Sequence, residues 1–151
     1  MRVYLVIVDE SVEAGSALRF AARRAAGTNG IVHLLALVPK QPFHAFSAIQ
    51  ATIEEEARAR AETLATAAAA EVMAIGGRMP IIAVRHGDDL RIIRDYLHEH
   101  PEVAALVLGA GADGAPGPLV SHFAGAGLGT LPCPLFIVPG GLSDEDIDRL
   151  S

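Results

Sequence analysis

Five short apolar runs alternate along this chain with segments of helical spacing, and this alternation limits the possible folds more than any other feature. The runs are rich in aliphatic and β-branched residues, as expected for strands that are covered on both faces. Strands that alternate with helices predict an α/β domain with a mostly parallel sheet and right-handed connections. The predicted strands are residues 3–8, 31–38, 80–84, 103–108 and 135–138.

Capping signals place helices between these strands. Ser11 is the expected N-cap of a first helix that ends near Gly27. The longest predicted helix runs from residue 49 to about residue 75, where a pair of glycines ends it. Asp88 or Asp89 is expected to cap the helix that precedes the fourth strand.

A glycine-rich loop follows the fourth strand, and Pro118 begins a short helix after it. Proline is favoured at the first helical position, so Gly117 is the expected N-cap. Glycines let the backbone approach a ligand closely, and free N–H groups at a helix start favour an anion such as phosphate. The loop is therefore a candidate phosphate-binding segment. An ordinary surface loop explains the same residues about as well, and no lysine or arginine lies between Arg94 and Arg149.

The composition argues against nucleic acid and membrane partners. A formal net charge of −6 and scattered arginines do not provide the clustered positive charge that nonspecific nucleic-acid binding requires. No apolar run approaches the roughly 20 residues needed to span a bilayer, so we expect a soluble protein. Cys133 is the single cysteine and cannot form an internal disulfide, which suits the reducing cytoplasm.

Three histidines outside the loop are expected to have structural roles. His33 lies within the second strand and is predicted to be a paired histidine of the sheet. His98 and His100 are two residues apart and point to different helix faces, which makes them a poor metal pair. Both are therefore predicted to be exposed at the end of their helix.

Two connecting segments are also expected to have plain roles. Residues 39–47 include Phe43 and Phe46 and are predicted to cover the core, with a lid over a pocket as the alternative. The acidic segment 143–148 is predicted to lie on the surface.

Several motifs together resemble the universal stress protein family over nearly the whole chain. They are Val6-Ile-Val-Asp-Glu-Ser11, Ala17-Leu-Arg-Phe-Ala-Ala22, Leu37-Val-Pro39, Val84-Arg-His-Gly-Asp88, Leu106-Val-Leu-Gly-Ala-Gly111 and Pro132-Cys-Pro-Leu-Phe-Ile-Val138. The resemblance implies a single three-layer domain over residues 1–151 with a peripheral tail at 140–151. Its fold would be flavodoxin-like, of the adenine nucleotide α-hydrolase type, with strand order 3-2-1-4-5. The resemblance also implies a homodimer through Leu135 to Val138, which would cover an apolar edge strand.

The family resemblance further implies a nucleotide site. ATP-binding members have an aspartate after the first strand, a valine after the second and a Gly-x2-Gly-x9-Gly-Ser/Thr segment after the fourth. Asp9 and Val38 match the first two positions, which border the adenosine in the family. The third segment is degenerate, because counting from Gly109 puts Ala112 at the second glycine. The candidate cofactor-binding residues are Asp9, Val38, Gly109, Gly111, Gly114, Gly117, Ser121 and His122.

Three functions are compatible with these residues. The first is a stress-response regulatory module that holds ATP or AMP, with Mg²⁺, in the crevice between strands 1 and 4. The second is a nucleotide-free dimeric interaction protein whose loop is packed shut by Pro116, Pro118 and Phe123. The third is slow phosphoanhydride hydrolysis, with Asp9 holding a metal ion and Ser121 or His122 near the phosphate. Adjacent helical side chains point about 100° apart, which argues against a nucleophile–base pair, so no catalytic residue and no protein metal site are assigned.

Overall fold

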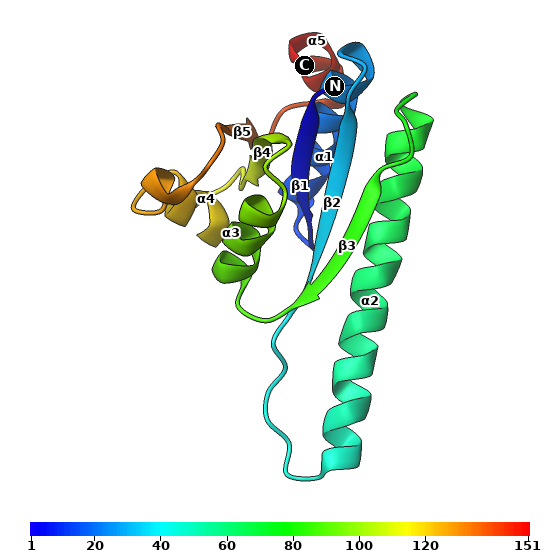
Figure 1. Cartoon of the computed structure of the whole chain (residues 1–151), viewed down its shortest axis with the longest axis vertical. Coiled ribbons are helices and arrows are strands. Elements are labelled where there is room, and N and C mark those ends of the chain that lie inside the picture. Colours follow the sequence, from blue (N-terminus) through cyan, green and yellow to red (C-terminus); the bar gives the residue numbers. More distant parts are fainter.

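Five parallel strands form the sheet at the centre of the computed structural model, which describes all residues from Met1 to Ser151 (Figure 1). The order is β3-β2-β1-β4-β5, which confirms the predicted fold class and strand order. The strands are β1 Val3–Val8, β2 Ile31–Val38, β3 Ile81–His86, β4 Val103–Ala110 and β5 Leu135–Pro139. Strand β3 ends two residues later than predicted. Its last two residues, Arg85 and His86, still pair with Leu37 and Val38 of β2.

Helices cover both faces of the sheet and make three layers. The helices are α1 Val12–Gly27, α2 Ser47–Ala74, α3 Asp89–Glu99, α4 Pro118–Phe123 and α5 Asp144–Leu150, with a 3-10 turn at Leu128–Thr130. Successive side chains of a strand point to opposite faces. Tyr4 and Val6 of β1 therefore pack under α1 and α2, whereas Leu5 and Ile7 pack under α3 and α4.

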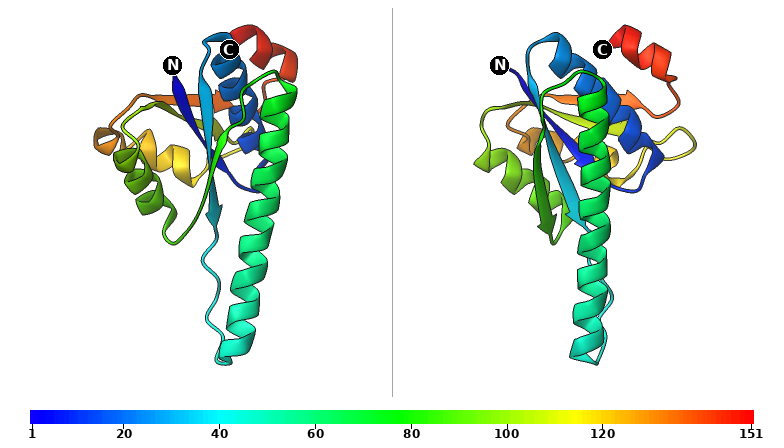
Figure 2. Two further views of the ribbon diagram at one scale, coloured as in Figure 1. Left: turned by 45° about the vertical axis from the view of Figure 1, so that its right-hand side comes forward. Right: turned by 90° about the vertical axis from the view of Figure 1, so that its right-hand side faces the viewer.

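Helix α2 is longer than the sheet that it covers, and its N-terminal part, about Ser47 to Glu56, extends past the carboxyl ends of the strands (Figures 1 and 2). Its buried residues all lie in the other part of the helix: Ala57, Ala61, Ala65, Ala68, Ala69 and Val72. Alanines at this face allow a close approach to the sheet. No helix of the chain has both the length and the apolar character to cross a membrane.

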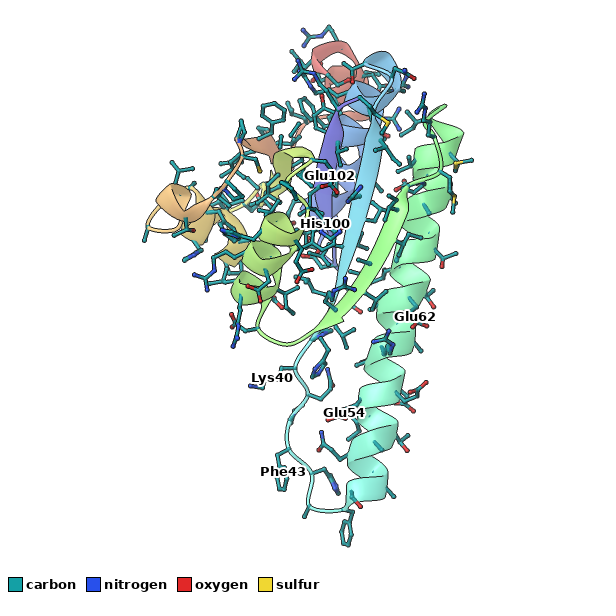
Figure 3. All side chains as sticks on the ribbon, viewed as in Figure 1. Lys40, Phe43, Glu54, Glu62, His100 and Glu102 are labelled. Atoms are coloured by element: carbon teal, nitrogen blue, oxygen red, sulfur yellow. The ribbon has the colours of Figure 1, made fainter.

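The segment between β2 and α2 does not cover the core as predicted. It runs along the projecting part of α2, with Lys40 and Phe43 on it and Glu54 on the facing helix (Figure 3). Phe43 is 89% exposed and Phe46 is 68% exposed. The helix takes this segment away from the body of the protein, which leaves no core beneath its phenylalanines.

The acidic segment near the C-terminus lies on the surface as predicted, with Ser143, Asp144 and Glu145 exposed, but it is ordered into α5, which docks on α1. Ile147 is 1% exposed. Asp148 accepts hydrogen bonds from both Arg19 and Arg23 at 2.8 to 3.0 Å. The hydrogen bond from Arg19 lowers the pKa of Asp148 below its usual value, with Arg23 adding to the effect. Ser143 caps the helix by accepting the Asp146 N–H at 3.1 Å.

A cluster of aromatic and histidine rings joins β2 to α3. His33 is 3% exposed, and its Nδ1 lies 2.8 Å from the Tyr96 hydroxyl. The His100 ring stacks on Tyr96 with centroids 4.0 Å apart, so His100 is half-buried and the prediction of two exposed histidines holds only for His98. His100 and Glu102 lie together beside the sheet in Figure 3.

Candidate functional site

A crevice of about 150 Å³ opens at the carboxyl ends of β1 and β4. This is the point where the strand order reverses, and open α/β sheets bind ligands there. Ile7, Ala14, Ala17, Val107 and Val120 are among the apolar residues of its wall. Asp9, Ser11, Glu13, Asp89, Gly109 and Gly117 provide polar groups or bare backbone.

Asp9 is held in position by Ser11. Its Oδ1 accepts hydrogen bonds from the Ser11 N–H at 2.8 Å and from the Ser11 hydroxyl. Ser11 occupies the N-cap position of α1, but its hydroxyl donates to Asp9 and makes no cap bond, unlike the predicted capping role. The Oδ2 atom of Asp9 has no protein partner and is available to a ligand.

Gly109 lies against α1, and this contact explains why a glycine is present. A Cβ atom at residue 109 would overlap the carbonyl oxygen of Glu13. The absence of a side chain therefore lets the first turn of α1 pack directly on the end of β4. Packing and ligand access both require a small residue here.

The loop after β4 turns into α4 at Gly117, which is the N-cap, with Pro118 at the start of the helix, as predicted. Gly117 has φ +106°, a conformation that residues with a side chain rarely adopt. The N–H of Gly111 donates to the Pro116 carbonyl at 3.0 Å, so that donor is already used inside the loop. Gly114 is exposed at the loop tip.

Five candidate residues do not line the crevice: Gly111 and Gly114 of the loop, together with Val38, Ser121 and His122. Ser121 is exposed on α4, and His122 packs against Gly127 and edge-on to Phe123. Val38 is buried and lines a separate cavity of about 350 Å³ with Arg58, His86 and residues of α2. Of the eight candidates, Asp9, Gly109 and Gly117 line the crevice.

The crevice is negatively charged. Asp9, Glu13 and Asp89 contribute carboxylates to it, and no lysine, arginine or histidine lines it. Burial raises the pKa of Asp89 above its usual value, and the neighbouring Asp88 and Asp9 carboxylates add to the effect. No group of three or more potential ligand side chains is arranged to hold a metal ion.

Glu13 and Asp89 are crevice residues that the sequence analysis did not assign to the site. Acidic residues in the first turn of a helix are common because they stabilise the helix dipole. Their positions in the sequence could have indicated the site. Glu13 lies in the first turn of the helix that follows Asp9, and Asp89 is the first residue of the helix that follows β3.

A second cavity of about 490 Å³ adjoins the crevice between α1 and α2. Ile7, Asp9, Ser11 and Ala14 line both hollows. Leu18, Leu64 and Ala68 contribute apolar wall on the far side. Glu10 and Glu71 also line this cavity, so Asp9 stands between a small crevice and a larger, mostly apolar cavity that has carboxylates on its wall.

Comparison with known proteins identifies relatives of this fold. The structure of universal stress protein UspA from Lactobacillus plantarum has a TM-score of 0.76 at 22% identity, covering 91% of this chain and 97% of that one. A universal stress protein family protein from Arabidopsis thaliana with AMP bound has a TM-score of 0.65 at 13% identity, covering 96% and 95%. The universal stress protein from Archaeoglobus fulgidus in complex with dAMP has a TM-score of 0.57 at 17% identity, covering 91% and 97%.

A search of curated proteins found no match. The sequence model of the universal stress protein family matches residues 1–139, which include all five strands and α1 to α4. The match extends over far more than half of the chain. Sheet order, strand positions and this sequence match agree, and the chain belongs to the universal stress protein family.

Proposed function

We propose that this protein is a regulatory module that binds an adenine nucleotide in the crevice between β1 and β4. The observation that carries the proposal is the meeting of Asp9, Gly109 and Gly117 in one hollow at the point where the strand order reverses. Relatives of the same fold have been solved with AMP and with dAMP.

The two adjoining hollows suit the two parts of a nucleoside. The apolar cavity beside Leu18 and Leu64 can take a flat base, and the free Oδ2 of Asp9 can accept a ribose hydroxyl. The crevice alone is smaller than the 300–1,000 Å³ typical of ligand pockets, which favours a ligand that uses both hollows. Any Mg²⁺ would be held chiefly by phosphates, as this cation usually is.

Calorimetric titration of the purified protein with AMP tests the proposal. Wild type should bind saturably, and Asp9→Ala should weaken binding about tenfold or more, because hydrogen bonds to charged groups contribute about 1.5–3 kcal/mol. Asp95→Asn, which alters an exposed carboxylate on α3, should bind like wild type. Absence of saturable binding up to millimolar AMP, with or without Mg²⁺, contradicts the proposal.

A nucleotide-free interaction protein is the second candidate. The bond between the Gly111 N–H and the Pro116 carbonyl favours it, because that bond closes the loop on itself. Mass spectrometry of freshly purified and then denatured protein separates the two candidates. Released AMP or ATP supports the first function, and a protein that releases neither and binds neither supports the second.

We also propose a cytoplasmic homodimer that pairs through β5. This strand is the outer edge of the sheet, and an apolar groove of about 290 Å³ runs along it. The groove is lined by Phe20, Leu135, Phe136, Ile137, Leu142 and Leu150, among others. An exposed apolar edge strand promotes pairing with another chain, and a second copy would cover both the groove and the strand edge.

A further inference from the structure

Glu13 lines the crevice between the end of β4 and the start of α4. Its backbone carbonyl and Cβ pack on Gly109, and its Cβ also lies beside Gly140. Its Oε1 lies near Gly117. If residue 117 had a Cβ atom, that atom would be 3.9 Å from the Glu13 Oε1. The Glu13 side chain thus spans from the end of β4 to the loop that precedes α4.

The Glu13 carboxylate has no partner in the protein. It makes no side-chain hydrogen bond, and none of the salt bridges involves it. Asp9 and Asp89 add two more carboxylates to the same hollow, and no cationic side chain lines it. Like charges a few ångströms apart repel, and the repulsion grows with the number of charges on the ligand.

We propose that Glu13 is a specificity-determining residue that selects adenine ligands of low phosphate charge, adenosine and AMP, over ATP. The proposal rests on the proposed function and specifies its ligand class. Adenosine keeps the base and the ribose hydroxyls, which the apolar wall and Asp9 can bind, and it brings no negative charge to Glu13. AMP should bind less tightly than adenosine, and ATP least tightly.

The charges around Glu13, more than the backbone donors, support this assignment. A phosphate bound by the loop would need N–H donors, yet the Gly111 N–H is bonded to Pro116 and the Gly140 N–H is bonded to the Ala110 carbonyl at 2.7 Å. These two N–H groups are therefore already used by the protein, whereas those of Ala112 to Ala115 and of Gly117 make no hydrogen bond within the chain. What disfavours an anion here is the set of carboxylates that no cationic side chain compensates.

Titration of wild type and Glu13→Gln with adenosine, AMP and ATP, without divalent cation and at low ionic strength, tests the proposal. In wild type the affinity should fall from adenosine to AMP to ATP. In Glu13→Gln the ATP affinity should rise about tenfold, and the adenosine affinity should stay within about twofold. The ATP gain should shrink in about 1 M salt, where the Debye length falls to about 3 Å.

A matched control is Glu145→Gln, which removes the same charge from the exposed surface of α5. This variant should reproduce the wild-type order of affinities. Denaturant unfolding of both variants checks that they are folded during the titration. Tighter binding of ATP than of adenosine by wild type, or an unchanged ratio in Glu13→Gln, overturns the inference and leaves the proposed function standing. Failure of all three ligands to bind either protein overturns the proposed function as well.

Discussion

The contact between Gly109 and Glu13 fixes how closely α1 approaches β4. Because a Cβ at residue 109 would overlap the Glu13 carbonyl oxygen, the helix can sit at this distance only above a glycine. The same contact places the Glu13 side chain at the mouth of the crevice. Gly109 therefore determines both the packing of α1 and the position of the Glu13 carboxylate in the crevice.

His33 should make stability depend on pH. Burial lowers the pKa of His33, and the nearby His100 lowers it further while Glu102 opposes them. Protonation is thus weaker in the folded chain than in the unfolded chain. The free energy of unfolding should fall as the pH drops through the unfolded value of 6.5 and level off below the folded pKa. The contribution is at most about 1.4 kcal/mol per pH unit.

Denaturant unfolding between pH 8 and pH 5 measures this effect. His33→Gln retains a partner for the Tyr96 hydroxyl and removes the titrating group, so its stability should change less with pH than that of wild type. His98→Gln removes an exposed histidine and should leave the wild-type slope nearly unchanged. Equal slopes in wild type and His33→Gln would contradict the prediction.

At the scale of elements, the outer and inner parts of α2 should differ in stability. Its buried residues begin at Ala57, and from Ser47 to Glu56 no side chain is buried. Helices obtain most of their stability from packing, so the outer part should open locally at low free energy. Hydrogen exchange should therefore be at least about tenfold faster for amides of residues 51–57 than for those of residues 61–72. The inner part is the internal control, and equal protection would contradict the prediction.

Element positions could be predicted where local patterns are strong. All five strands were located to within two residues, since continuous aliphatic runs identify buried strands. Strands β3 and β4 each end two residues later than predicted; in β3 the added residues, Arg85 and His86, are polar, which an edge strand tolerates. Helix α5 was missed although Ser143 followed by three acidic residues is a helix-start pattern. The projection of α2 could not be predicted, because it depends on the length of the helix relative to the sheet.

The candidate site was only partly predictable for a similar reason. Asp9 and Gly109 could be placed together, because the ends of parallel strands meet at one edge of the sheet. Ser121 and Val38 lie outside the crevice, since their positions depend on the path of a loop and on which face of β2 meets α2. Glu13 required the structure, because its position depends on the close packing of α1 on Gly109.

At the scale of the whole molecule, the two edges of the sheet allow a matched test of assembly. Ile137 on β5 is 40% exposed and Ile82 on β3 is 39% exposed. If copies pair through β5, Ile137→Lys should convert a dimer to a monomer in sedimentation equilibrium, because a lysine cannot be buried unpaired without a large cost. Ile82→Lys should remain dimeric. A monomeric wild type, or a dimer that only Ile82→Lys disrupts, would contradict pairing through β5.

The projecting part of α2 also has a mechanical consequence. This continuous helix packs on the sheet from Ala57 onward, and beyond that point only the segment that returns to β2 accompanies it. The stretch from Ser47 to Glu56 adds about 15 Å beyond Ala57, at 1.5 Å per residue. The displacement caused by a slight tilt of the helix at Ala57 grows with distance along this stretch. Phe46 would therefore move farther than any residue that lies over the strands.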